Sequence, residues 1–202
     1  MLLQNKTVVV TGCNRGIGKK ILEVFSANGA TIIACVRNIT EEFKTFLNEI
    51  KKKYNNQIIP IQFDLNDESQ IKEAASNILS SNSSIDILVN NAATIHTALF
   101  QMTSIKKLKE VFETDFFSQT IFTQYILKSM IKKKSGSILY ISSSSALDGN
   151  EGRSAYSSAK AAVIAQAKVL SREVGIHNIR VNTIAPGLTD TDMMRKNTPK
   201  EI

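Results

Sequence analysis

Short apolar segments alternate with longer segments of helical period along the whole chain. The apolar segments are rich in β-branched residues, which predicts strands buried on both faces. The segments between them repeat apolar residues every three or four positions, which predicts amphipathic helices. The predicted strands are residues 7–11, 31–36, 57–64, 85–90, 137–141 and 179–184. The predicted helices are one ending at Asn28, three over about 40–54, 68–80 and 104–131, and one that carries Tyr156 and ends near Gly175.

The strict alternation predicts an α/β fold with a parallel sheet covered by helices on both sides. We expect a doubly wound sheet of six strands in the order 3-2-1-4-5-6. Pro60 has no backbone N–H to donate, so the third strand belongs at a sheet edge, where this order places it. A length of 202 residues suits one domain, so residues 1–202 are predicted to fold as a single unit.

The turn after the first strand is rich in glycine and reads TGCNRGIG over residues 11–18. Glycines at this junction let backbone N–H groups approach a pyrophosphate at the helix N-terminus. A merely tight turn is the alternative, but the position after the first strand of an alternating chain favours a dinucleotide site. The residues expected to contact the cofactor here are Gly12, Asn14, Arg15, Gly16, Ile17 and Gly18.

The end of the second strand bears on the choice of cofactor. An acidic residue there would bind the adenosine ribose and repel a 2′-phosphate. This chain has Arg37 instead, and Arg15 lies in the glycine-rich turn. Two guanidinium groups near one ribose favour a 2′-phosphate, so we predict NADP(H) rather than NAD(H). The alternative is two solvated surface arginines.

The next two strand ends add further candidates for cofactor binding. Asp64 and its neighbour Leu65 follow the third strand, where a carboxylate can accept from the adenine amino group or cap the following helix. Asn91 belongs to the segment NNAA after the fourth strand. Small residues and amides there either let a ligand lie against the strand ends or bond the sheet to the turn.

Tyr156 and Lys160 lie four residues apart near the start of a predicted helix, so the phenol and the ammonium share one helical face. The unperturbed pKa of a tyrosine is about 10, and a nearby cation lowers it. The pair therefore predicts a proton donor. A cluster of serines, residues 142–145, follows the fifth strand. Taken singly, each of these features is more often a core tyrosine, a solvated lysine or a loop.

In combination, these segments are similar to one family. The chain resembles the short-chain dehydrogenase/reductase family over essentially its full length, through TGCNRGIG, NNAA, the serine after ILYIS, YSSAK and PGLTDTDM. The resemblance implies a Rossmann fold in which Tyr156 is the general acid of carbonyl reduction. It implies that Lys160 lowers the tyrosine pKa and bonds the nicotinamide ribose. Ser143, thirteen residues before Tyr156, would hold the carbonyl oxygen, with Ser142, Ser144 and Ser145 as neighbouring alternatives.

The same resemblance implies that Pro186, Gly187 and Thr189 flank the nicotinamide. The implied activity is NADP(H)-dependent interconversion of a ketone and a secondary alcohol by hydride transfer. The pattern looks most like the acyl-carrier-protein reductases, which puts a 3-oxoacyl thioester first among the substrates, before sugars and small ketones. The alternative is a nucleotide-binding or partner protein of the same fold with little catalysis. A homodimer or homotetramer, formed through the long helices after strands four and five, is also implied.

Three departures from the family pattern matter. Asp115 stands where the family usually has an asparagine that supports a proton relay to the lysine. Its carboxylate either pairs with Lys160 and retains the relay, or overstabilises the ammonium and slows turnover. Ala93 replaces a glycine. The sequence ends at Ile202, so we expect the substrate-covering region to be shortened and a seventh strand to be absent.

The charge, the cysteines and the length of the apolar runs indicate which kinds of partner and which cellular location to expect. The net charge of +7 comes largely from lysine clusters near predicted helix ends, without interleaved aromatic residues, so a nucleic-acid surface is not expected. Cys13 and Cys35 fit no metal-ligand spacing, and we predict free thiols in a cytoplasmic protein without a metal site. No apolar run approaches the roughly 18 residues of a membrane span.

Overall fold

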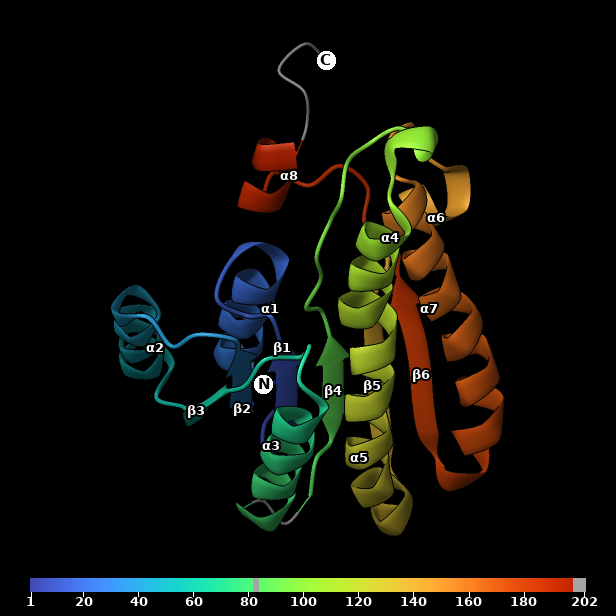
Figure 1. Cartoon of the computed structure of the whole chain (residues 1–202). Helices are drawn as coiled ribbons and strands as arrows, with labels where there is room; N and C mark the ends of the chain where they lie inside the picture. The colour runs from blue at the N-terminus through green and yellow to red at the C-terminus, as the bar shows by residue number, and fades with distance from the viewer. Residues whose placement is uncertain (82–83, 198–202) are drawn as a thin grey trace.

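The computed structural model describes residues 1–81 and 84–197, which build a parallel sheet with helices on both faces (Figure 1). The strand order is β3-β2-β1-β4-β5-β6, as predicted. Pro60 pairs in register with Ala34 of β2, and β3 lies at the sheet edge, where the missing N–H of a proline is tolerated. The strands are β1 (Thr7–Thr11), β2 (Thr31–Val36), β3 (Ile58–Gln62), β4 (Ile87–Asn90), β5 (Gly136–Ile141) and β6 (Ile179–Ile184).

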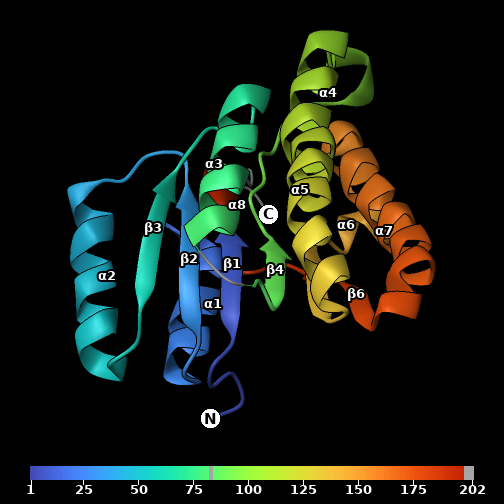
Figure 2. The ribbon, with the colours of Figure 1, turned by 90° about the horizontal axis from the view of Figure 1, so that it is seen from below.

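Helices lie on both faces of the sheet (Figure 2), and alternate residues of β1 and β2 belong to the two cores on these opposite faces. Val9 of β1 packs with α3 (Glu68–Ser81), α5 (Ser118–Lys133) and α7 (Ser154–Val174). Val8 and Val10 pack with α1 (Gly16–Ala27) and α2 (Glu41–Tyr54) on the other face. The continuous apolar character of β1 follows from this double burial.

The predicted helix over 104–131 is interrupted in the structure. It consists of α4 (Ile105–Phe112), a π-helical turn η2 (Glu113–Phe117) and α5. A π-helical turn holds one extra residue and changes which side chains face inward, and such turns are frequent at functional sites. Here the turn buries Asp115 completely. Hydrophobic periodicity did not predict this insertion, because it occupies only one turn.

Short elements lie around the carboxyl ends of the strands. They include η1 (Phe100–Met102), α6 (Ser145–Asp148) and α8 (Asp192–Asn197), while η3 (Gly175–His177) precedes β6. Figure 1 shows α8 beyond the carboxyl ends of the strands. This end of a doubly wound sheet is where ligands bind. Among the described residues, no helix is long and apolar enough to cross a membrane.

Candidate functional site

A cavity of about 1080 Å³ opens at the carboxyl ends of the strands. It is lined by every residue predicted to contact a cofactor, together with Ser143. Asp115 lies outside the lining, because the π-helical turn buries its side chain. The predicted cofactor residues in the wall are Gly12, Asn14, Arg15, Gly16, Ile17, Gly18, Arg37, Asp64, Leu65, Asn91, Tyr156, Lys160, Pro186, Gly187 and Thr189.

The glycine-rich turn depends on missing side chains. Gly12 has a φ of +66°, and a Cβ there would lie 2.7 Å from Ala92 Cα. A Cβ on Gly18 would collide with the carbonyl oxygen of Gly12 and the side chain of Asn91. Glycine at both positions therefore lets the turn pack closely between β1 and β4. Arg15 caps α1 through its backbone alone, and the first turn of α1 contains no acidic residue, so its N–H groups suit an anion.

Asn91 ties the end of β4 to this turn. Its Nδ2 donates to the carbonyl oxygens of Thr11, at 2.9 Å, and Gly12, at 3.0 Å. Its backbone N–H donates to Thr11 Oγ1 at 3.0 Å. The asparagine thus has the structural role that the sequence left open, while it also lines the cavity. Ala93 is not among the described residues with positive φ, so replacing the usual glycine requires no backbone strain.

The far end of the cavity carries positive charge. Arg15 and Arg37 are both exposed and both line the wall. Asp64 also lies in this wall, where its Oδ1 accepts from the backbone N–H of Asn66 at 2.9 Å. The helix-cap function belongs to Asp67, whose Oδ1 accepts from the backbone N–H groups of Ser69 and Gln70 at the start of α3. Asp64 is therefore free of the capping role that was its alternative.

Tyr156 and Lys160 occupy the first turns of α7 and face the other end of the cavity. The Lys160 ammonium lies 5.8 Å from the centroid of the Tyr156 ring. Lys160 is 1% exposed, and its Nζ donates to the carbonyl oxygen of Ile141 at 3.0 Å. The shared face predicted from the spacing of four residues is therefore formed.

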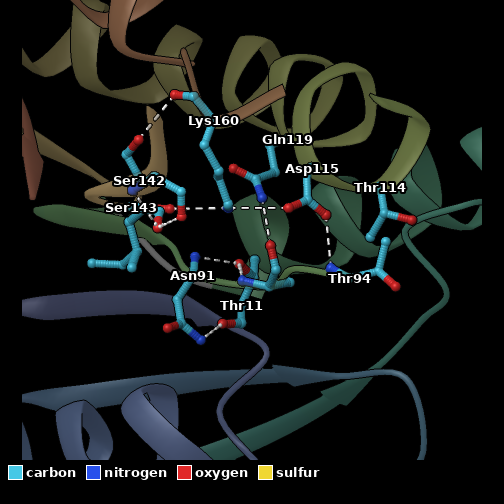
Figure 3. A network of polar contacts seen from close by, with 12 residues as sticks. Thr11, Asn91, Thr94, Thr114, Asp115, Gln119, Ser142, Ser143 and Lys160 are labelled. Atoms are coloured by element: carbon cyan, nitrogen blue, oxygen red, sulfur yellow. Dashed lines mark hydrogen bonds and ion pairs between the residues drawn. The ribbon is translucent and has the colours of Figure 1, made fainter. Parts of the chain in front are cut away.

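Behind Lys160 lies the buried carboxylate of Asp115 (Figure 3). Its Oδ2 lies 3.2 Å from Lys160 Nζ, and its Oδ1 accepts from the backbone N–H of Thr94 at 2.7 Å. The Oδ2 contact is an ion pair without an aligned hydrogen bond. Burial raises the pKa of Asp115, and the Lys160 ammonium and the Thr94 N–H oppose that rise only in part.

The hydrogen bonds distinguish the serines at the end of β5. Ser142 Oγ donates to the backbone carbonyl oxygen of Lys160 at 2.9 Å, so this hydroxyl fixes α7 against β5. Ser143 Oγ lies 2.8 Å from Ser145 Oγ and accepts from the Ser145 N–H at 3.2 Å. The Ser142 hydroxyl is committed to the backbone, whereas the Ser143 and Ser145 hydroxyls bond each other in the cavity wall. This arrangement favours Ser143 over Ser142 as the residue that meets a ligand.

The family profile described as short chain dehydrogenase matches residues 6–202. The chain belongs to the short-chain dehydrogenase family. It is an oxidoreductase of the class that acts on CH–OH and C=O groups.

Named relatives of this short-chain dehydrogenase include bacterial reductases. The chain is 36% identical to a 3-oxoacyl-(acyl-carrier-protein) reductase FabG of Chlamydia trachomatis over 194 residues, which are 96% of this chain and 78% of that protein. It is 37% identical to the enzyme of the same name from Aquifex aeolicus over 191 residues, which are 95% and 77% of the two chains.

A solved structure named as an NAD(P)-dependent gluconate 5-dehydrogenase from Beutenbergia cavernae, with bound NADP at low occupancy, superimposes with a TM-score of 0.90. The two chains are 27% identical, and the match covers 96% of this chain and 76% of the other.

Sequence reasoning missed several cavity residues of this dehydrogenase. Thr191, Met193 and Met194 bring the start of α8 into the wall. Arg153 lines the cavity from the N-terminus of α7. Its position three residues before Tyr156 was a usable signal, because residues three apart share a helical face. The motif PGLTDTDM contains Thr191 and Met193, but it did not indicate that α8 enters the cavity wall, since that depends on how the chain folds back after β6.

Proposed function

We propose that this protein is an NADP(H)-dependent reductase that converts a ketone into a secondary alcohol, or catalyses the reverse reaction. The single observation that carries the proposal is the Tyr156–Lys160 pair facing the same cavity as the glycine-rich turn. A hydride donor and a proton donor then reach opposite ends of one carbonyl bond.

The residues at the far end of the cavity fit a 2′-phosphorylated nucleotide. Arg15 and Arg37 supply two guanidinium groups, and β2 ends without an acidic residue. The N-terminus of α1, which has no side-chain cap, and the close-packed glycines suit the pyrophosphate. A named structural relative contains NADP, which is consistent with this choice.

The roles proposed for the residues follow from their contacts. When bound, NADPH supplies the hydride. Tyr156 gives its hydroxyl proton to the carbonyl oxygen that becomes the alcohol. Ser143 donates a hydrogen bond to the same oxygen. Lys160 is held beneath the tyrosine by Ile141 and Asp115, so its charge is fixed where it stabilises the phenolate left after proton transfer. Asp115 acts on this chemistry through Lys160.

For the substrate, the names of the bacterial relatives favour a 3-oxoacyl compound. Small ketones and sugars are the next candidates. The wall contributed by α8 includes Met193 and Met194, whose flexible apolar side chains suit an acyl chain.

The proposal includes a homo-oligomer that assembles through the helices after β4 and β5. Phe117 in the π-helical turn is 48% exposed and Val169 on α7 is 57% exposed. Apolar side chains of this size on neighbouring helices suit a subunit interface. A cytoplasmic location is proposed because Cys13 and Cys35 are free thiols.

The test follows NADPH absorbance with a panel of 3-oxoacyl esters, thioesters and small ketones. Replacing Tyr156 by Phe is expected to lower kcat about 10²- to 10⁴-fold, because the variant keeps the ring and loses the proton donor. NADPH binding by calorimetry is expected to persist in the variant. Tyr54→Phe, on α2, is the matched control. Turnover that survives Tyr156→Phe, or NADPH binding without turnover of any carbonyl compound, would refute the proposal.

A further inference from the structure

Arg153 is a charged cavity residue for which the proposed mechanism has no use. It directly precedes α7 and lies three positions before Tyr156, so the two side chains occupy neighbouring positions on one helical face. Its side chain is half-buried and lines the cavity at the tyrosine end.

Only part of the hydrogen-bonding capacity of the Arg153 guanidinium is used. Nη2 donates to the backbone carbonyl oxygen of Asn197 at 2.8 Å, at the end of α8. Nη1 is buried and has no hydrogen-bond partner in the described part of the chain. Over residues 1–81 and 84–197, no carboxylate forms an ion pair with Arg153. Glu151, the acidic residue next to it in sequence, is exposed.

A cation in this state favours an anionic ligand. Buried donors are normally paired, and a partly desolvated charge needs an opposite charge or several acceptors. Burial lowers the pKa of Arg153, which is consistent with this loss of water. A carboxylate is the acceptor whose two oxygens match the planar fork of a guanidinium.

We propose that Arg153 binds a free carboxylate of the substrate, so that the preferred substrates are short oxo acids. This inference rests on the proposed function and refines it: the 3-oxoacyl skeleton would carry a carboxylate where the relatives' names imply a thioester. A neutral thioester offers no anion to the guanidinium, whereas 3-oxobutanoate places a carboxylate one carbon from the reacting carbonyl.

A purely structural role is the competing explanation. The bond to Asn197 joins α7 to α8, so Arg153 would then only hold α8 over the cavity. Loss of such a link should change the KM of every substrate alike. Loss of a carboxylate-binding group should raise the KM of the acid and leave the KM of the ester unchanged.

The experiment compares 3-oxobutanoate with its methyl ester, which has the same reacting ketone, and with a 3-oxobutanoyl thioester. The wild-type KM is expected to be at least about tenfold lower for the acid than for the ester. Arg153→Gln should raise the KM of the acid about 10- to 100-fold and change the KM of the ester less than about twofold. Arg153→Lys should recover part of the preference, because it keeps the charge and loses the fork.

Arg172→Gln is the matched control, because this exposed arginine lies at the other end of α7. Calorimetric titration of acid and ester into the protein, with and without NADPH, measures selectivity independently of turnover. The inference would be overturned if Arg153→Gln raised the KM of the acid and of the ester equally, or if the wild type had a lower KM for the ester or the thioester than for the acid. Either result would leave the proposed function standing. Absence of turnover for all three compounds counts against the proposed function, and the calorimetric preference then decides the role of Arg153.

Discussion

At the residue scale, the proposed chemistry rests on a buried ion pair. Lys160 and Asp115 are 1% and 0% exposed, and each needs the other because a lone charge at this depth is costly. An asparagine at position 115 would keep an acceptor for the Thr94 N–H and remove the countercharge. The Asp115 side chain therefore helps to hold the Lys160 side chain in place before any ligand binds.

The pH dependence of stability tests this pair. The pKa of Asp115 is raised on folding, so the folded state binds more protons than the unfolded state near that pKa. Stability from this group is present below the unfolded pKa and is lost as the pH rises through the folded value. In urea unfolding, Asp115→Asn should therefore gain stability relative to wild type as the pH rises above about 4, the ordinary pKa of an aspartate.

The exposed Asp148 on α6, replaced by Asn, is the control and should show no such trend. A stability difference that changes in the opposite direction would mean that Lys160, and not burial, dominates the pKa of Asp115. The kcat of Asp115→Asn separates the two consequences left open by the sequence. An increase would indicate that the carboxylate slows turnover, and a decrease would indicate that it supports the relay.

Arg37 is the residue that tests cofactor choice. Replacing it by Ala removes one of the two guanidinium groups at the far end of the cavity. The Kd of NADPH should rise about 10-fold or more, while that of NADH changes little, because only NADPH carries a 2′-phosphate. Fluorescence titration of both nucleotides measures the two values. An equal change in both would remove the argument for a phosphate site.

At the scale of elements, the sheet and helices are joined at the amino ends of the strands by one carboxylate. Asp86 accepts from the backbone N–H of Thr7 at 2.9 Å and pairs with Lys133 at 2.6 Å and Lys6 at 3.3 Å. It thereby links β1, β4 and the end of α5. Although burial alone would raise the pKa of Asp86, these partners together lower it.

Because the pKa of Asp86 is lowered on folding, its contribution to stability is present above the unfolded pKa and is lost as the pH falls through the folded value. Asp86→Asn should cost about 1–2 kcal/mol at pH 7, a modest value because Lys6 and Lys133 are partly exposed and screened. The difference from wild type should shrink as the pH falls below about 4, the ordinary pKa of an aspartate, and through the lower folded value. Chemical unfolding across this range measures it, with Glu41→Gln in an exposed i,i+3 pair as the control. A cost that persists at low pH would contradict the ionic explanation.

At the scale of the whole molecule, the proposed assembly predicts a mass. Light scattering coupled to gel filtration should give two or four times the chain mass of 22.3 kDa. Phe117→Glu and Val169→Glu should lower that mass, because each places a charge in the proposed interface. Val24→Glu on α1, at 44% exposure, is the control on the other face of the sheet and should not change the mass. A monomeric wild type would contradict the proposed oligomer.

The sequence by itself determined the order of elements and marked residues that line the cavity proposed for the nucleotide. Periodicity marked the strands because burial on both faces demands apolar residues throughout. Pro60 located the edge strand because a missing N–H cannot serve a central one. The glycines and the spacing of Tyr156 and Lys160 were readable because they depend on local backbone geometry.

Tertiary structure decided what depends on distant segments. The π-helical turn buried Asp115 beside Lys160, and the packing of α7 on β5 bound Ser142 to the backbone and left Ser143 in the cavity wall. The return of the chain after β6 brought α8 to Arg153. Arg153 thereby lies in the cavity wall, where it is a candidate determinant of substrate specificity. No local pattern encodes these contacts, because each joins residues more than fifteen positions apart, which only the packed fold brings together.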